Sequence, residues 1–170
     1  LTVPQVSALN KVYGGAKNPR TGAQIFPGWI PGSEEGWTGY FVGHAEPARV
    51  EFWRYWIFGD PDWQPTSFDF DHDLAWADTH LPEVAATGTD LNAFRQNNGK
   101  LFLYQGWADP VVPPLSTINY YEAVQKALVP AAGDFARLFM VPGMGHCQGG
   151  PGPDTFDSLG ALDQWVTTGT

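Results

Sequence analysis

The 170-residue sequence lacks several features that whole classes of protein require. It has 9 Lys and Arg against 18 Asp and Glu, a net charge of −9, and no basic stripe, so it would repel nucleic acids and anionic membranes. No apolar run approaches the roughly 18 residues that span a bilayer. The first residues, LTVPQVSALNKVYGG, also lack the basic-then-apolar order of a secretory signal. We therefore expect neither a nucleic acid nor a membrane as a partner.

Cysteine is almost absent. Cys147 is the only one, directly after His146 in the loop PGMGHCQGGPG, residues 142–152. A lone thiol has two interpretations: it is buried and unreactive, or it is half of a disulfide whose partner lies on another segment. The chain also begins and ends in what read as mid-element stretches, which favours a fragment or one piece of a processed enzyme.

Aromatic residues are abundant in the first half, which otherwise shows little regular periodicity. Residues 4–15 predict a short helix with a Gly stop, and residues 17–43 an irregular, well-packed excursion rich in Gly, Pro and aromatic rings. Residues 47–59, PARVEFWRYWIFG, predict a helix with apolar side chains on almost every face, which should be buried or cover something.

Carboxylates cluster after that helix. Residues 55–94 contain no Lys or Arg, and FDFDHD places Asp69, Asp71 and Asp73 at alternate positions, as at the start of a calcium loop. Leu74 and His80 stand where that loop needs its glycine and its closing glutamate. We therefore favour capping and loop hydrogen bonds here, and predict no metal site.

The second half predicts alternating helices and strands. Apolar runs at 100–107 and 135–143 predict buried strands, and the spacing of apolar residues at 89–99, 115–128 and 156–166 predicts helices. On the last helix Leu159, Leu162 and Trp165 should share one side. Two β-then-α units in succession indicate parallel strands of an α/β sheet, and further strands must complete that sheet.

Asp109 and His146 each follow one of these strands. The carboxyl ends of parallel strands share one edge, where reactive groups gather. An Asp beside a His fixes the ring's tautomer and stabilises the imidazolium that forms when the ring takes a proton from a nucleophile. An Asp alone at such a position is more often a turn or cap residue than a catalytic one, and a His alone in a Gly-rich loop is similarly ambiguous. The order acid then histidine is that of α/β-hydrolases, but no serine here stands in a nucleophile elbow.

DLNAFRQNNGKLFLYQGWADPVVPP and MVPGMGHCQGG closely resemble the C-terminal part of the tannase and feruloyl esterase family. Two upstream stretches, LTVPQVSALNKVYGGAKNPRTGAQIFPGWIPGSEEGW and FWRYWIFGDPDWQPTSFDFDHD, resemble that family's lid, so the resemblance covers essentially the whole chain. It implies an α/β fold: the C-terminal portion of an α/β-hydrolase, residues 89–170, plus an irregular aromatic-rich lid segment, residues 1–88.

The family resemblance also implies roles for individual residues. Asp109 would be the triad acid, His146 the general base and Cys147 half of a disulfide that ties the two catalytic loops together. The nucleophilic Ser, the partner Cys and the lid calcium site would lie before Leu1, so the chain alone should be inactive and carries no cofactor. Trp37, Arg54 and Val112 are the candidate substrate-binding residues, although Arg54 could equally pair with Glu51.

The implied protein is a secreted or periplasmic serine esterase acting on esters of aromatic acids, hydroxycinnamic, gallic or similar. Two alternatives stay open at this point. The density of aromatic rings also suits a non-catalytic module that binds plant phenolics or carbohydrate. An α/β-hydrolase of other bond specificity fits as well, because the fold alone does not select the chemistry.

Overall fold

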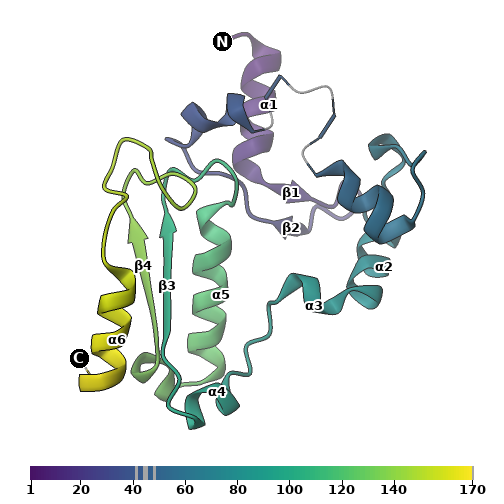
Figure 1. The fold of residues 1–170 in the computed structure, drawn as a ribbon. Coiled ribbons are helices and arrows are strands. Elements are labelled where there is room, and N and C mark those ends of the chain that lie inside the picture. The colour runs from purple at the N-terminus through teal and green to yellow at the C-terminus, as the bar shows by residue number, and fades with distance from the viewer. Residues whose placement is uncertain (41, 44–45, 48, 170) are drawn as a thin grey trace.

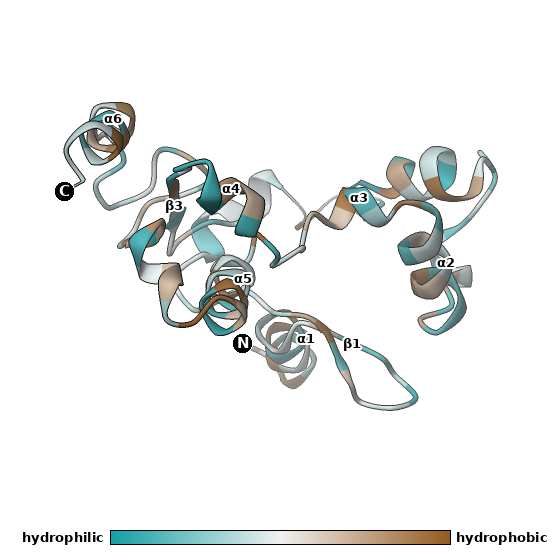
Figure 2. Ribbon diagram, turned by 90° about the horizontal axis from the view of Figure 1, so that it is seen from below, coloured by the Kyte–Doolittle hydropathy of each residue, from teal (hydrophilic) through white to brown (hydrophobic). Residues whose placement is uncertain are grey.

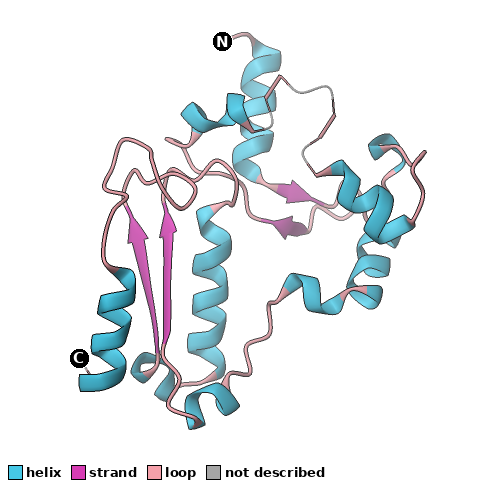
Figure 3. Ribbon diagram, viewed as in Figure 1, coloured by secondary structure: helices cyan, strands magenta, loops and turns pink. Residues whose placement is uncertain are grey.

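A computed structural model describes residues 1–40, 42–43, 46–47 and 49–169 (Figure 1). In the second half, α4 (Asn92–Gln96), β3 (Leu101–Gly106), α5 (Pro114–Ala127), η4 (Ala131–Asp134), β4 (Ala136–Val141) and α6 (Ser158–Thr168) follow in order. The strands pair in parallel, from Leu101 opposite Ala136 to Gly106 opposite Val141. The predicted strand, helix, strand and helix are therefore confirmed, and Figure 3 shows both arrows pointing toward the same loops.

α5 covers one face of this strand pair, and the main buried cluster lies where the end of α5, η4 and the start of β4 meet (Figure 2). Its buried residues are Val124, Leu128, Ala132, Phe135 and Ala136. The apolar spacing of α5 and the apolar runs of the strands produce this layer, because side chains alternate across a strand and repeat every three to four residues on a helix.

The opposite face of the strand pair carries α6. Trp165 is buried there, and its ring lies 4.2 Å from the Arg137 guanidinium. The prediction that Leu159 shares one side of the helix with Trp165 is wrong: Leu159 is 79% exposed, whereas Trp165 is buried. The face is open elsewhere too, since Tyr104 and Phe139 are also exposed.

The first half begins with α1 (Val3–Gly14), where Thr2 and Gln5 form a capping box and Gly15 ends the helix at φ 71°. An antiparallel hairpin of β1 (Ala16–Lys17) and β2 (Gln24–Phe26) follows, which the sequence did not predict within 17–43. Strands of two and three residues are too short to show an alternating pattern. The hairpin turn is tied down where Asn18 and Arg20 both donate to Asp71.

The predicted helix at 47–59 is shorter and differently wound. Its regular part, η2 (Phe52–Phe58), is a π-helix that ends at Gly59 in the left-handed conformation. Ile57 is buried on one side, whereas Trp56 is 68% exposed. The helix is therefore only partly covered, despite being apolar on almost every face.

An aromatic cluster holds the segment around η2 together. Trp53 meets Phe68 edge-on at 4.8 Å between ring centroids, and Phe58 stacks on Trp63 at 5.1 Å. The remaining elements of this half are η1 (Glu34–Gly39), η3 (Pro65–Ser67), α2 (His72–His80) and α3 (Pro82–Ala85). Figure 2 shows α2 and α3 as one group, joined to α4 by an extended segment.

The acidic run before α2 forms hydrogen bonds of the predicted kind. Asp69 accepts from the backbone N–H groups of Asp71 and His72, and Asp73 accepts from that of Asp69. These bonds lower the pKa of Asp69 below its usual value, chiefly through the backbone N–H of His72. The helix therefore begins at a turn that the carboxylates themselves stabilise.

Candidate active site

The carboxyl ends of β3 and β4 bring Asp109 and His146 into contact. Nδ1 of His146 lies 2.9 Å from Oδ2 of Asp109, as expected for residues that follow two parallel strands. Asp109 is 1% exposed, whereas the His146 side chain is 45% exposed. An ionised carboxylate only accepts hydrogen bonds, so Nδ1 carries the proton and Nε2 of the neutral ring is left as the basic nitrogen.

Four donors surround the buried Asp109 carboxylate. Oδ1 accepts from the backbone N–H groups of Val111 at 2.7 Å and Val112 at 2.9 Å. Oδ2 accepts from His146 and also from Nε2 of Gln105 at 2.6 Å. A buried charge is tolerated when it is bonded in this way. Sequence reasoning missed Gln105, although an amide inside the otherwise apolar run KLFLYQGW was the available signal.

The two loops are held against one another by backbone contacts. The N–H of Ala108 donates to the carbonyl of Met144 at 3.0 Å, and that of Trp107 to the carbonyl of Val141 at 3.0 Å. Gly106 permits the approach, because a Cβ at that position would lie 2.2 Å from the Met144 carbonyl oxygen. The position of His146 is thus set by the end of β3 as well as by β4.

A second aspartate–histidine pair shows which features single out the first. Nδ1 of His72 lies 2.8 Å from Oδ1 of Asp73 at the start of α2, but the His72 ring is 70% exposed. That pair belongs to the turn already described, at the start of a helix and not at the carboxyl ends of paired parallel strands. Contact between the two residue types is therefore not the distinguishing feature; the strand-end position and the four donors are.

A cleft of about 610 Å³ opens beside His146. One wall comes from the loops after β3 and β4, and the other from the segment before and within η1. The lining residues are Gly32, Ser33, Glu35, Gly36, Ala108, Pro110, Gly145, His146, Gln148, Gly150 and Pro151. The cleft therefore lies between the predicted lid segment and the α/β part.

Ser33 lines the cleft but is fully engaged elsewhere. Its hydroxyl donates to the carbonyl of Ile30 at 2.9 Å and accepts from Nε1 of Trp37 at 3.1 Å. Within the described ranges, the only hydrogen bond of the His146 ring is to Asp109. Ser33 is thus a structural residue of the cleft wall, and the structure does not pair it with the histidine.

The three predicted substrate-binding residues do not line this cleft. Trp37 is 7% exposed and packs against Tyr13 at 5.8 Å between ring centroids. Arg54 forms two bonds to Glu46, at 2.6 and 3.0 Å, and one to the carbonyl of Trp63, so its partner is not Glu51. Val112 contributes its backbone N–H to Asp109. Their roles toward substrate stay predictions.

Cys147 is exposed and its thiol is free, which rules out the interpretation of a buried thiol. Its backbone lies in the left-handed region at φ 63°, which is uncommon for a residue other than glycine. Among the described residues, no group of three or more His, Cys, Asp or Glu side chains gathers to hold a metal ion.

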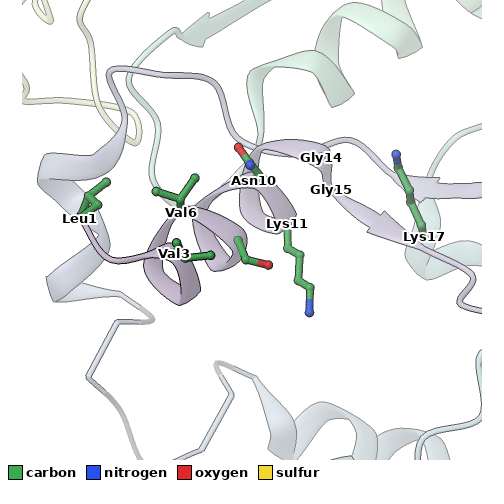
Figure 4. Close-up of a pocket in the computed structure, with 9 residues that line it drawn as sticks. Leu1, Val3, Val6, Asn10, Lys11, Gly14, Gly15 and Lys17 are labelled. Atoms are coloured by element: carbon green, nitrogen blue, oxygen red, sulfur yellow. The ribbon is translucent and has the colours of Figure 1, made fainter.

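A larger hollow of about 770 Å³ runs along α1 (Figure 4). Leu1, Val3 and Val6 line it together with Lys11 and Lys17. Among the described residues that line it there is no carboxylate, histidine or cysteine, so this hollow holds no aspartate–histidine pair.

Parallel strands, a crossover helix and an acid–histidine pair at the carboxyl edge define part of an α/β-hydrolase. The sequence matches the family Tannase and feruloyl esterase over residues 1–170. The chain belongs to that family.

Individual relatives agree with this assignment. The chain is 36% identical to an uncharacterized esterase of Xanthomonas campestris pv. campestris, covering 99% of this chain and 38% of that protein. It is 33% identical to mono(2-hydroxyethyl) terephthalate hydrolase of Piscinibacter sakaiensis, covering 99% and 34%. The crystal structure of feruloyl esterase B from Aspergillus oryzae superposes with a TM-score of 0.86 at 28% identity, covering 100% and 37%.

The chain spans only a little over a third of the length of these relatives. Within the described residues, no helix has the length and apolar character needed to cross a bilayer.

Proposed function

We propose that these residues supply the acid, the histidine and the lid of a serine esterase that hydrolyses esters of aromatic carboxylic acids. The observation that carries this proposal is the 2.9 Å contact between His146 and the buried Asp109 beside a cleft. Nε2 of His146 takes the proton of a serine, returns it to the leaving alcohol and then activates water for deacylation, while Asp109 orients the ring.

The nucleophile in this proposal comes from a segment outside the 170 residues, so the chain alone is inactive. A cysteine next to that serine pairs with Cys147, which is exposed and free to do so. Such a bridge would limit relative movement of the two catalytic loops, and forms in an oxidising compartment, so the protein is secreted or periplasmic. Residues 1–88 act as the lid, and the lid's calcium site also lies outside this chain.

The relatives support the ester bond as the target and an aromatic acid as the acyl group. Their names include a feruloyl esterase and a hydrolase of a terephthalate monoester. A non-catalytic module for phenolics gives no reason for a buried aspartate to hold a half-exposed histidine at the strand ends.

The test is the change His146→Ala in the complete protein, assayed with methyl ferulate. We expect turnover to fall by about 10³-fold or more. The ring is half-exposed, so thermal unfolding should change little. His72→Ala is the matched control, because it removes another aspartate-bound imidazole, one that lies outside the cleft. Turnover that survives in His146→Ala would sink the assignment.

A further inference from the structure

We propose that Gln105 is a positioning residue for the Asp109–His146 pair and that Thr117 anchors its carboxamide. The inference rests on the proposed function and deepens it. It concerns a chain of three hydrogen bonds that starts on α5, crosses the end of β3 and reaches the histidine.

Each bond in the chain has one allowed direction. Nε2 of Gln105 donates to Oδ2 of Asp109 at 2.6 Å, because an ionised carboxylate only accepts. The oxygen end of the amide, Oε1, therefore faces Thr117, whose hydroxyl donates to it at 3.0 Å. The carboxylate thus determines which end of the amide meets Asp109, and the Thr117 hydroxyl anchors the other end. Without that hydroxyl, no described residue donates to Oε1, and the plane of the carboxamide is less firmly held.

Gln105 acts on the carboxylate oxygen that touches the histidine. The other oxygen, Oδ1, is already fixed by the two backbone N–H groups of Val111 and Val112. Among the described residues, Oδ2 accepts hydrogen bonds only from Gln105 and His146. If the amide donor is removed, the carboxyl group is free to tilt about the anchored oxygen, and His146 tilts with it.

The two positioning side chains belong to rigid elements. Gln105 is the second-last residue of β3, and Thr117 lies in the first turn of α5. The bond between them spans the loop that carries Asp109, so strand and helix together define where that loop holds its carboxylate. Sites supported in this way by regular elements hold their geometry more closely than sites supported by loops.

A purely structural role is the competing explanation, since any partly buried amide needs partners. The two roles differ in what they predict. A structural role lowers the amount of folded protein, whereas a positioning role lowers the turnover of each folded molecule. Kinetics normalised to titrated active sites therefore separate them.

The experiment uses the complete esterase with Gln105→Met, Thr117→Val and the double variant. We expect kcat per active site to fall about 10- to 100-fold in Gln105→Met with KM nearly unchanged, the range seen when supporting partners of a functional side chain are removed. Thr117→Val should lower kcat less, and Thr117→Ser, which keeps the hydroxyl, should restore it. Gln125→Met is the matched control, an amide on α5 without a bond to Asp109.

The double variant is the decisive measurement. If Thr117 acts through Gln105, adding Thr117→Val to Gln105→Met has no further effect on kcat. Multiplied effects would overturn the relay, and a wild-type kcat in Gln105→Met would overturn the positioning role. If Gln105→Met does not fold, Thr117→Val against Thr117→Ser decides the same question, since equal kcat values in those two variants would reject the proposal.

Failure of this inference is distinguishable from failure of the proposed function. An inactive His146→Ala together with a wild-type kcat in Gln105→Met rejects the positioning role alone. Turnover in His146→Ala rejects both.

Discussion

Asp109 and His146 are 37 residues apart in the sequence, yet Oδ2 of the first lies 2.9 Å from Nδ1 of the second. Parallel pairing of β3 with β4 accounts for this, because it puts the loops that follow both strands at one edge. The burial of Asp109 and the exposure of His146 divide the work between them: the carboxylate orients the ring, and the ring faces the cleft.

Changing Asp109 to Asn should lower kcat by roughly 10⁴-fold, because the amide no longer holds the ring in the tautomer that leaves Nε2 basic. The replacement retains an oxygen that can accept from Val111 and Val112, so the fold should survive. Steady-state kinetics of the complete protein measure the effect. Asp73→Asn is the control, since it alters the aspartate of the second pair. A loss of less than tenfold in Asp109→Asn would contradict the proposed role.

Changing Gly106 to Ala should damage both stability and activity. The new methyl would lie 2.2 Å from the Met144 carbonyl and 2.5 Å from that of Gly145. Overpacking of this kind costs about 1–3 kcal/mol. Displacing His146 by about 1 Å would cost on the order of 100-fold in kcat.

Gly133→Ala is the control for Gly106, because no atom of the described residues lies within 4 Å of a Cβ there. Denaturant unfolding and kinetics of both variants test the expectation. Equal behaviour of the two alanine variants would show that the approach of the loops is not required.

The prediction of Arg54 as a substrate anchor is open to a direct test. Its guanidinium already binds Glu46 and the carbonyl of Trp63, and the Glu46 contact raises the pKa of Arg54. We therefore expect Arg54→Met to lower the melting temperature and to leave KM for methyl ferulate unchanged. Arg49→Met, which removes an arginine bonded to Tyr40, serves as the comparison. A higher KM in Arg54→Met alone would favour the anchor.

The α/β part was predictable because its signals are local and strong. Compact apolar runs and helical spacing identify β3, α5, β4 and α6. The contact between Asp109 and His146 follows from the parallel pairing of the two strands. The unpredicted features depend on contacts distant in sequence: the hairpin of β1 and β2 is held through Asp71, 53 residues after Asn18. The missed Gln105 belongs here too, because its role depends on Thr117 of the next helix.

The helix ends were less predictable than the helices. The helix predicted at 89–99 would end at Gly99. Instead α4 ends at Gln96, and the residue in the left-handed conformation is Asn98, at φ 59°. Gly99 serves a different need, since a Cβ there would lie 2.6 Å from the Phe94 ring. The glycine therefore does lie just after the helix, but it is needed to make room for the Phe94 ring and not to adopt a left-handed conformation.

A hydrogen bond between α1 and η1, next to the residues that line the cleft, provides a prediction that depends on pH. Tyr13 donates to Glu34, whose other oxygen accepts from the N–H of Gly32. The bond lowers the pKa of Glu34 below 4.5 and raises the pKa of Tyr13 above 10.0. Its stabilising effect is therefore fully present above the unfolded Glu pKa and below the unfolded Tyr pKa. It is lost as pH falls through the lowered value or rises through the raised one.

Tyr13→Phe should consequently lower the free energy of unfolding by about 1 kcal/mol near pH 7, and by less toward the acid extreme. The tyrosine also packs on Trp37, but phenylalanine retains that ring contact, so the difference isolates the hydroxyl. Denaturant unfolding of both proteins between pH 3 and pH 10, on the order of one unit apart, measures it. Tyr55→Phe, at a 58% exposed position, controls for the loss of a phenol. A difference that stays constant into the acid range would show that Glu34 is not the partner, because an uncharged acceptor does not titrate there.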